Sequence, residues 1–226
     1  MMSVAEAIEG RQSIRAFLAD KPVPHATIER ILAIAGRAPS GSNIQPWKVH
    51  AVTGDVLARL KAALSARHES GDEGRREYNY YPVTWREPYI GRRRETGWGL
   101  YGLLGIAKGD TAAMKAQHGR NFVFFDAPVG LIFTLDGDME QGSWLDTGMF
   151  IQSVMLAARG EGLETCPQAA HCIYGDTIRG VLGIAADQNI VCGMALGYAD
   201  PTAPVNAFRT SRIAIDTFTT FHGSGK

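Results

Sequence analysis

The stretch APSGSNIQPWKVH, from Ala38 to His50, joins a predicted helix to a predicted strand through small and polar residues. Apolar residues at helical spacing follow Pro24, and Pro39 is expected to end that helix; they are Ile28, Ile31, Leu32 and Ala35. The strand is predicted at KVHAVT, residues 48–53. The connection between them is rich in small polar groups, and these patterns alone do not say what requires them.

The rest of the chain alternates helical and strand patterns. Ser3 and Glu6 have the spacing of a capping box, which predicts a short first helix. Asp55 is expected to cap another helix, and residues 143–163 and 176–184 are predicted helices as well. The first of these two carries no charge between positions 147 and 158, which is typical of a buried helix. APVGLIFTL (127–135) and NIVCGMALGY (189–198) are predicted to be buried strands.

Composition limits the class of protein. The 226 residues, 45% of them apolar, suit one globular domain spanning residues 1–226. Twenty-three basic and 23 acidic residues give no net charge, which argues against nucleic acid or a membrane as a partner. No apolar run is long enough to cross a membrane and no signal peptide is evident, so we expect a cytoplasmic protein. Three cysteines without a CxxC pair predict reduced thiols and no metal site.

Two regions lack a clear periodicity. Residues 67–105 are rich in arginine and aromatic residues and are expected to form an ordered insertion. This region contains GWGLYG (97–102), the glycine spacing of a dinucleotide-binding motif. The charged GRRRET stands where that motif needs an apolar strand, so we interpret the match as a coincidence. Residues 200–226 contain prolines and β-branched residues with little helical period, which predicts an extended tail.

Two short basic clusters are candidates for binding an anion. In RQSIRAF an extended backbone would point Arg11, Ser13 and Arg15 to one side. Guanidinium groups can bind phosphate oxygens through paired, charge-assisted hydrogen bonds. FRTSR supplies Arg209 and Arg212 far downstream. A solvated basic edge is the alternative for either cluster alone, but two such clusters in a neutral chain indicate one shared anion.

RQSIRAF, APSGSNIQPWKVH, GMFIQSVMLAARGEGLETCP and a C-terminal arginine after CGMALGYADP together resemble the FMN-dependent nitroreductase family in order, spacing and content. The resemblance covers nearly the whole chain, and YNYYPVTWREPY is similar to the nitrobenzoate-reductase-like branch. It implies an α+β sandwich with a central, mainly antiparallel sheet flanked by helices. It also implies an interlocked homodimer with an extended C-terminal tail and FMN at the subunit interface.

The resemblance further implies three sets of cofactor-binding residues. The phosphate and the pyrimidine edge of FMN would be held by Arg11, Gln12, Ser13, Arg15, Arg209 and Arg212. The flavin bound mainly by the other subunit would be reached by Pro39, Ser40, Gly41, Asn43 and Gln45. The loop along the flavin ring would be Pro167, Gln168, Ala169 and Ala170. Asn121 lies near a further family contact.

The implied reaction is a ping-pong hydride transfer. NAD(P)H passes a hydride to flavin N5 and leaves, and a small nitroaromatic substrate then takes its place and is reduced. Because the cofactor carries the chemistry, no side chain is expected to act as a catalytic acid or base. Two alternatives stay open. One is the same flavin fold with another reaction, such as dehalogenation, alkene or quinone reduction or substrate oxidation; the other is a flavin-binding protein without turnover.

Overall fold

A four-stranded antiparallel sheet forms the centre of the computed structural model, which describes residues 2–223. The strand order is β1-β2-β4-β3. The strands are β1 (Lys48–Val52), β2 (Val129–Asp136), β3 (Glu164–Gln168) and β4 (Gln188–Gly197). The predicted α+β class with an antiparallel sheet is confirmed.

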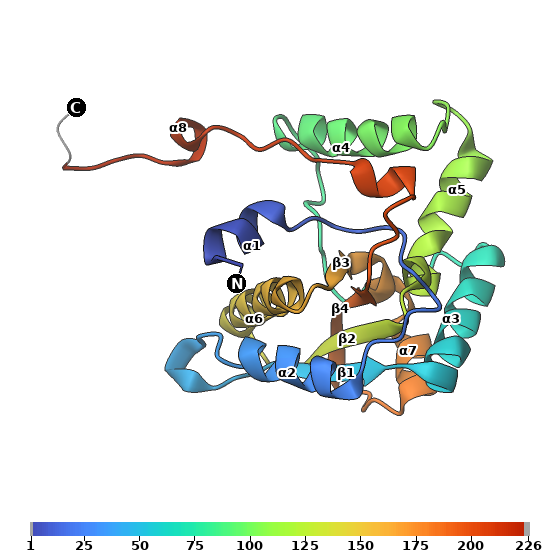
Figure 1. Ribbon diagram of the computed structural model, residues 1–226, viewed down its shortest axis with the longest axis horizontal. Coiled ribbons are helices and arrows are strands. Elements are labelled where there is room, and N and C mark those ends of the chain that lie inside the picture. The colour runs from blue at the N-terminus through green and yellow to red at the C-terminus, as the bar shows by residue number, and fades with distance from the viewer. Residues whose placement is uncertain (1, 224–226) are drawn as a thin grey trace.

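Helices flank this sheet (Figure 1). The α-helices are α1 (Val4–Gly10), α2 (His25–Ala35), α3 (Gly54–Glu69), α4 (Tyr89–Leu103), α5 (Thr111–Gly119), α6 (Gln141–Gly160), α7 (Gly175–Leu182) and α8 (Ile215–Phe218). Four 3-10 segments connect them: η1 (Gly41–Asn43), η2 (Arg120–Asp126), η3 (Ala169–Tyr174) and η4 (Pro204–Ala207).

Alternation along the central strands divides the interior into two cores. In β2, Leu131 and Phe133 pack with α2 and α6, whereas Ile132 faces the opposite core with α3 and α7. Successive side chains of a strand point to opposite faces, so a continuous apolar run indicates a sheet covered on both sides. The predicted burial of the uncharged helix is also observed, since α6 buries Phe150 and Val154 completely or nearly so.

Several predicted boundaries are corrected by the structure. The capping box of Ser3 and Glu6 is present, but the cap of α3 is Thr53, and Asp55 lies within its first turn. Helix α2 ends at Ala35 and not at Pro39, because the Arg37 and Ala38 N–H groups bond to carbonyls three residues back and the chain leaves the helix through a short turn.

Residues 164–168, which include the first two residues of the implied ring loop, form the edge strand β3. They pair with β4 from Glu164 opposite Gly197 to Gln168 opposite Gly193. Pro167 lacks a backbone N–H, which an edge strand tolerates because one of its sides has no strand neighbour. Of the predicted ring loop, Pro167 and Gln168 therefore belong to the sheet, and Ala169 and Ala170 begin η3.

The insertion contains helix α4, which crosses one end of the molecule (Figure 1). None of its residues is buried in this chain, so it has no apolar stripe from which a period could be recognised. GWGLYG lies in the C-terminal half of this helix and does not follow a strand, as the interpretation of a chance match predicts.

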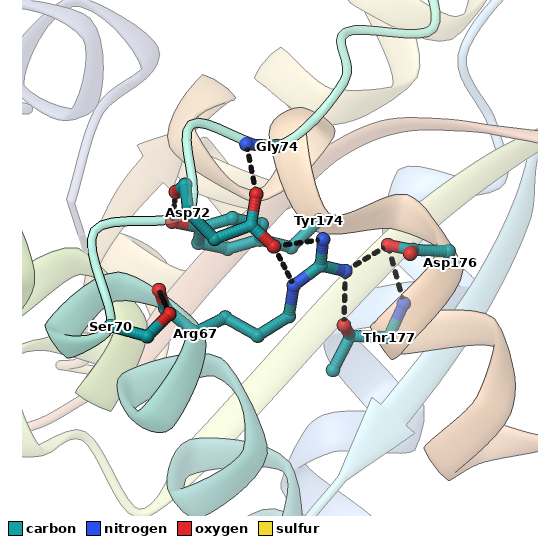
Figure 2. Close-up of polar contacts among 7 residues, drawn as sticks. All are labelled: Arg67, Ser70, Asp72, Gly74, Tyr174, Asp176 and Thr177. Atoms are coloured by element: carbon teal, nitrogen blue, oxygen red, sulfur yellow. Dashed lines mark hydrogen bonds and ion pairs between the residues drawn. The ribbon is translucent and has the colours of Figure 1, made fainter.

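An arginine network fastens the start of the insertion to α7 (Figure 2). Arg67 donates to the Asp72 carboxylate at 2.6 and 2.9 Å and to Asp176 and Thr177 at 2.5 and 2.8 Å. Its guanidinium also lies 4.9 Å from the ring centroid of Tyr174, whose hydroxyl donates to the Asp72 carbonyl. The insertion is thus tied down where it leaves α3.

The segment after β4 carries η4 and α8 but little other regular structure. It runs beside α4 and then away from the body of the protein (Figure 1). Within residues 2–223 we find no helix with the length and apolarity needed to cross a membrane.

Candidate functional site

The two basic clusters meet at one cavity. It has a volume of about 510 Å³ and is lined by Ile8, Glu9, Arg11, Gln12, Ser13, Arg15, Phe208, Arg209, Thr210 and Arg212. Within the first cluster, Ile14 is only 1% exposed and donates its N–H to the Thr165 carbonyl on β3 at 3.0 Å. Arg11, Ser13 and Arg15 line the cavity while Ile14 is buried, but Gln12 lines it as well, so these residues do not divide strictly between two sides.

The cavity carries an excess of positive charge. Four arginines and one glutamate line it, and within the described residues none of those arginines forms an ion pair. Burial lowers the pKa of Arg11, and the charge of Arg212 lowers it further. Like charges held together without a counter-charge are a binding site for an anion.

One buried polar atom in this cavity also lacks a partner. The side-chain Oε1 of Gln12 is shielded from solvent and has no hydrogen-bond donor in the described residues. A buried acceptor without a donor costs free energy unless a ligand satisfies it. The site therefore offers cationic donors for a phosphate and an acceptor for an N–H group.

Asn206 is a structural residue of this site that no sequence pattern singles out. Its Oδ1 accepts the Arg15 N–H at 2.8 Å, and its Nδ2 donates to the Ala16 and Asp200 carbonyls at 2.8 and 2.9 Å. These bonds fix the start of the C-terminal segment against Arg15. The two residues are 191 positions apart, so no local pattern could have identified the contact.

The second predicted set lies outside this cavity. Ser42, Asn43 and Gln45 adopt left-handed backbone angles, with φ of 48°, 60° and 49°. The loop is held by the Gly41 N–H, which donates to Asp146 at 3.0 Å, and by the Gln45 N–H, which donates to the Ser40 hydroxyl at 3.0 Å. Asn43 and Gln45 are exposed, and none of the set Pro39, Ser40, Gly41, Asn43 and Gln45 lines the arginine cavity.

The third set follows β3. Gln168 is 2% exposed, and its Nε2 donates to the Asn121 carbonyl at 2.8 Å, while its Oε1 has no donor among the described residues. Asn121, the further candidate, is therefore placed beside this set. Ala169 and Ala170 are partly exposed at the start of η3. The described residues contain no group of three or more His, Cys, Asp and Glu side chains that could hold a metal ion.

The family model and the relatives that this chain matches agree with one another. The model of the Nitroreductase family matches residues 8–198. The chain is 42% identical over 218 residues to 4-nitrobenzoate reductase of Pseudomonas putida, covering 96% of this chain and 94% of that protein. It is 39% identical over 219 residues to chloronitrobenzene nitroreductase of Comamonas testosteroni, covering 96% of each.

A solved structure is similar over the whole fold. The FMN and NADPH-dependent nitroreductase NfnB from Sphigopyxis sp. strain HMH superposes with a TM-score of 0.95 at 41% identity. The match covers 98% of this chain and 100% of that one.

A buried histidine, His171, lies in η3 directly after Ala169 and Ala170 of the third set. It is fully buried, and its ring stacks on Phe124 with a centroid distance of 4.5 Å. The ring lies so close to β4 that a Cβ on Gly193 would be 1.9 Å from Nδ1. Burial lowers the pKa of His171 to about 3, so the imidazole is neutral at physiological pH.

The free energy of unfolding should therefore fall on acidification. Below about pH 6.5 the unfolded chain binds a proton at His171 that the folded chain refuses, which costs up to about 1.4 kcal/mol per pH unit. When the free energy of unfolding is measured in urea between pH 7.5 and 5, it should fall less steeply with pH for His171→Gln than for the wild-type protein. His25→Gln, which removes an exposed imidazole, is the matched control and should keep the wild-type slope. Equal slopes for all three proteins would contradict a buried neutral His171.

Proposed function

The chain belongs to the nitroreductase family, and from that premise we propose that it is an FMN-dependent oxidoreductase that reduces nitroaromatic compounds with NADPH or NADH. The relatives named above act on nitroaromatics, and the similar solved structure is an FMN and NADPH-dependent enzyme. The observation that carries the proposal is the meeting of Arg11, Arg15, Arg209 and Arg212 at one cavity that has Glu9 as its one acidic lining residue among the described residues. Dehalogenation, alkene or quinone reduction, substrate oxidation and flavin binding without turnover are not favoured by these relatives.

The residues of the cavity fit the terminal phosphate and polar edge of FMN. Arg11, Ser13, Arg15, Arg209 and Arg212 would hold the phosphate by charge-assisted hydrogen bonds. The unpartnered Oε1 of Gln12 would accept a hydrogen bond from the cofactor, as would that of Gln168 at the end of β3. Bound FMN would supply the hydride chemistry, and we assign no side chain as acid or base.

We propose that a second copy of the chain completes the site. Pro39, Ser40, Gly41, Asn43 and Gln45 form a preset, exposed loop that does not reach the arginine cavity of its own chain. Large apolar side chains are exposed on the surface of the single chain, including Val4, Ile8, Ile44, Leu145, Phe218 and Phe221. A homodimer would bury such surface and bring the loop of one subunit to the FMN of the other. The C-terminal tail of each subunit would wrap around the other subunit.

We also propose that the protein works in the cytoplasm. Cys166, Cys172 and Cys192 are buried and not in disulfides. Burial raises the pKa of Cys166 and of Cys172 to about 11, so these thiols stay protonated and unreactive. Three thiols of this kind suit a reducing compartment.

The reaction is tested by anaerobic titration of the FMN-loaded protein. NADPH or NADH should bleach the visible flavin absorbance, and a nitroaromatic such as 4-nitrobenzoate should restore it. Because the two substrates use one site in turn, steady-state double-reciprocal plots at several NADPH concentrations should be parallel. Halogenated aromatics, activated alkenes and quinones form the comparison panel. Failure of both nicotinamides to bleach the flavin, or faster turnover of a panel compound, would contradict the proposed reaction.

The shared site is tested by subunit complementation. Arg15→Ala and Asn43→Ala homodimers should both bind FMN more weakly, the first by about 10 to 150-fold because charge-assisted hydrogen bonds are lost. Unfolding and refolding the two variants together should restore one intact site in each heterodimer. Tags of different mass would establish that heterodimers form. Heterodimers that regain no FMN would show that all these residues serve a site within one chain.

A further inference from the structure

The arginine arm, residues 206–212, is fastened to the protein at three places. Asn206 bonds to the backbone of Arg15 and Ala16, as described above. The Ser211 hydroxyl donates to Glu95 on α4 at 2.8 Å. Between these two points, Phe208 lies against α4 at Gly99. The arm carries Arg209 and Arg212, so these contacts set the position of the backbone from which both guanidinium groups extend.

The contact at Gly99 depends on the absence of a side chain. An ideal Cβ at this position would lie 2.6 Å from Cε2 and 3.1 Å from Cζ of Phe208. Real Cβ atoms do not approach other atoms that closely, so any larger residue would displace the ring. Gly97 and Gly102 on the same helix have no atom within 4 Å of such a Cβ. Packing therefore requires a glycine at position 99 of GWGLYG but not at positions 97 and 102.

Such an anchor is needed because the arm brings its two positively charged guanidinium groups close to those of Arg11 and Arg15. Arg212 lowers the pKa of Arg11, which shows that the two guanidinium groups repel each other. Before an anion arrives, nothing in the cavity offsets this repulsion except Glu9 at its lining. Arg209 and Arg212 are exposed, and their own contacts are local, such as Arg212 to Thr210 at 2.6 Å.

We propose that Gly99 and Phe208 are positioning residues for the phosphate of FMN, seating the arginine arm on α4 so that Arg209 and Arg212 face Arg11 and Arg15. This inference rests on the proposed function and extends it to the insertion. A site whose donors are held in place before binding loses less entropy when the ligand arrives. The insertion helix thus contributes to cofactor affinity through residues that do not themselves bind the phosphate.

Flavins with and without a phosphate separate positioning from general damage to the fold. The apoproteins of the wild type and of Gly99→Ala, Gly97→Ala, Gly102→Ala and Phe208→Ala are titrated with FMN and with riboflavin, using quenching of flavin fluorescence. Gly99→Ala and Phe208→Ala should bind FMN about 10-fold more weakly or worse, because a charge-assisted contact is misplaced. The affinity of Gly99→Ala for riboflavin should stay within about twofold, since riboflavin has no phosphate to contact the arm and Gly99 does not line the cavity.

The two other glycines are matched controls on the same helix. Gly97→Ala and Gly102→Ala make the same chemical change in open space, so both should keep wild-type affinity for FMN and riboflavin. The double variant Gly99→Ala with Phe208→Ala should bind FMN no more weakly than Phe208→Ala alone, because both substitutions remove one contact. If Gly99→Ala does not fold, Phe208→Ala and Phe208→Leu carry the test.

The outcomes distinguish this inference from the proposed function. A wild-type protein that prefers FMN over riboflavin, together with unchanged preference in Gly99→Ala and Phe208→Ala, would overturn the positioning role and leave the proposed function intact. Equal losses in Gly99→Ala, Gly97→Ala and Gly102→Ala would overturn it as well. A wild-type protein that binds neither flavin would contradict the proposed function, and this inference with it.

Discussion

Four guanidinium groups held at one cavity are the constraint on which the rest of the structure depends. Arg11 and Arg15 come from the start of the chain and Arg209 and Arg212 from its end, and within the described residues they form no ion pair. Such groups repel each other, so their convergence must be stabilised elsewhere in the fold. The free energy for it comes from apolar burial in the two cores on either side of the central sheet.

The fold meets this constraint by fastening the N-terminal segment to β3 and the C-terminal segment to the N-terminal one. The Ile14 N–H donates to Thr165, and Asn206 bridges Arg15 to the segment after β4. A neighbouring pair, Arg159 and Glu164, lies beside this junction, where burial raises the pKa of Glu164 although Arg159, Arg209 and Arg11 oppose the shift. Glu164 is thus engaged by Arg159, and among the described residues Glu9 is the acidic side chain in the lining of the cavity.

Much of this could be predicted from the sequence, because the signals are local. The alternation in RQSIRAF, the continuous apolar run of β2 and the uncharged face of α6 each reflect a neighbour relation within a few residues. Helix α4 gave no such signal because none of its residues is buried in this chain. The roles of Asn206 and of Gly99 against Phe208 could not be predicted, since their partners are more than a hundred positions away in the sequence. The resemblance implies a loop at Pro167 and Gln168, whereas both belong to β3; a proline is unusual in strands away from a sheet edge, so the local sequence does not favour a strand here.

The central claim is that the converging arginines bind the terminal phosphate of FMN. The most direct measurement is the identity of the flavin that the purified protein releases on denaturation, determined by chromatography against FMN, FAD and riboflavin standards. The purified protein should be yellow and should release FMN, because the arginine cavity suits a terminal phosphate. Release of FAD, or absence of bound flavin even after incubation with FMN, would contradict it.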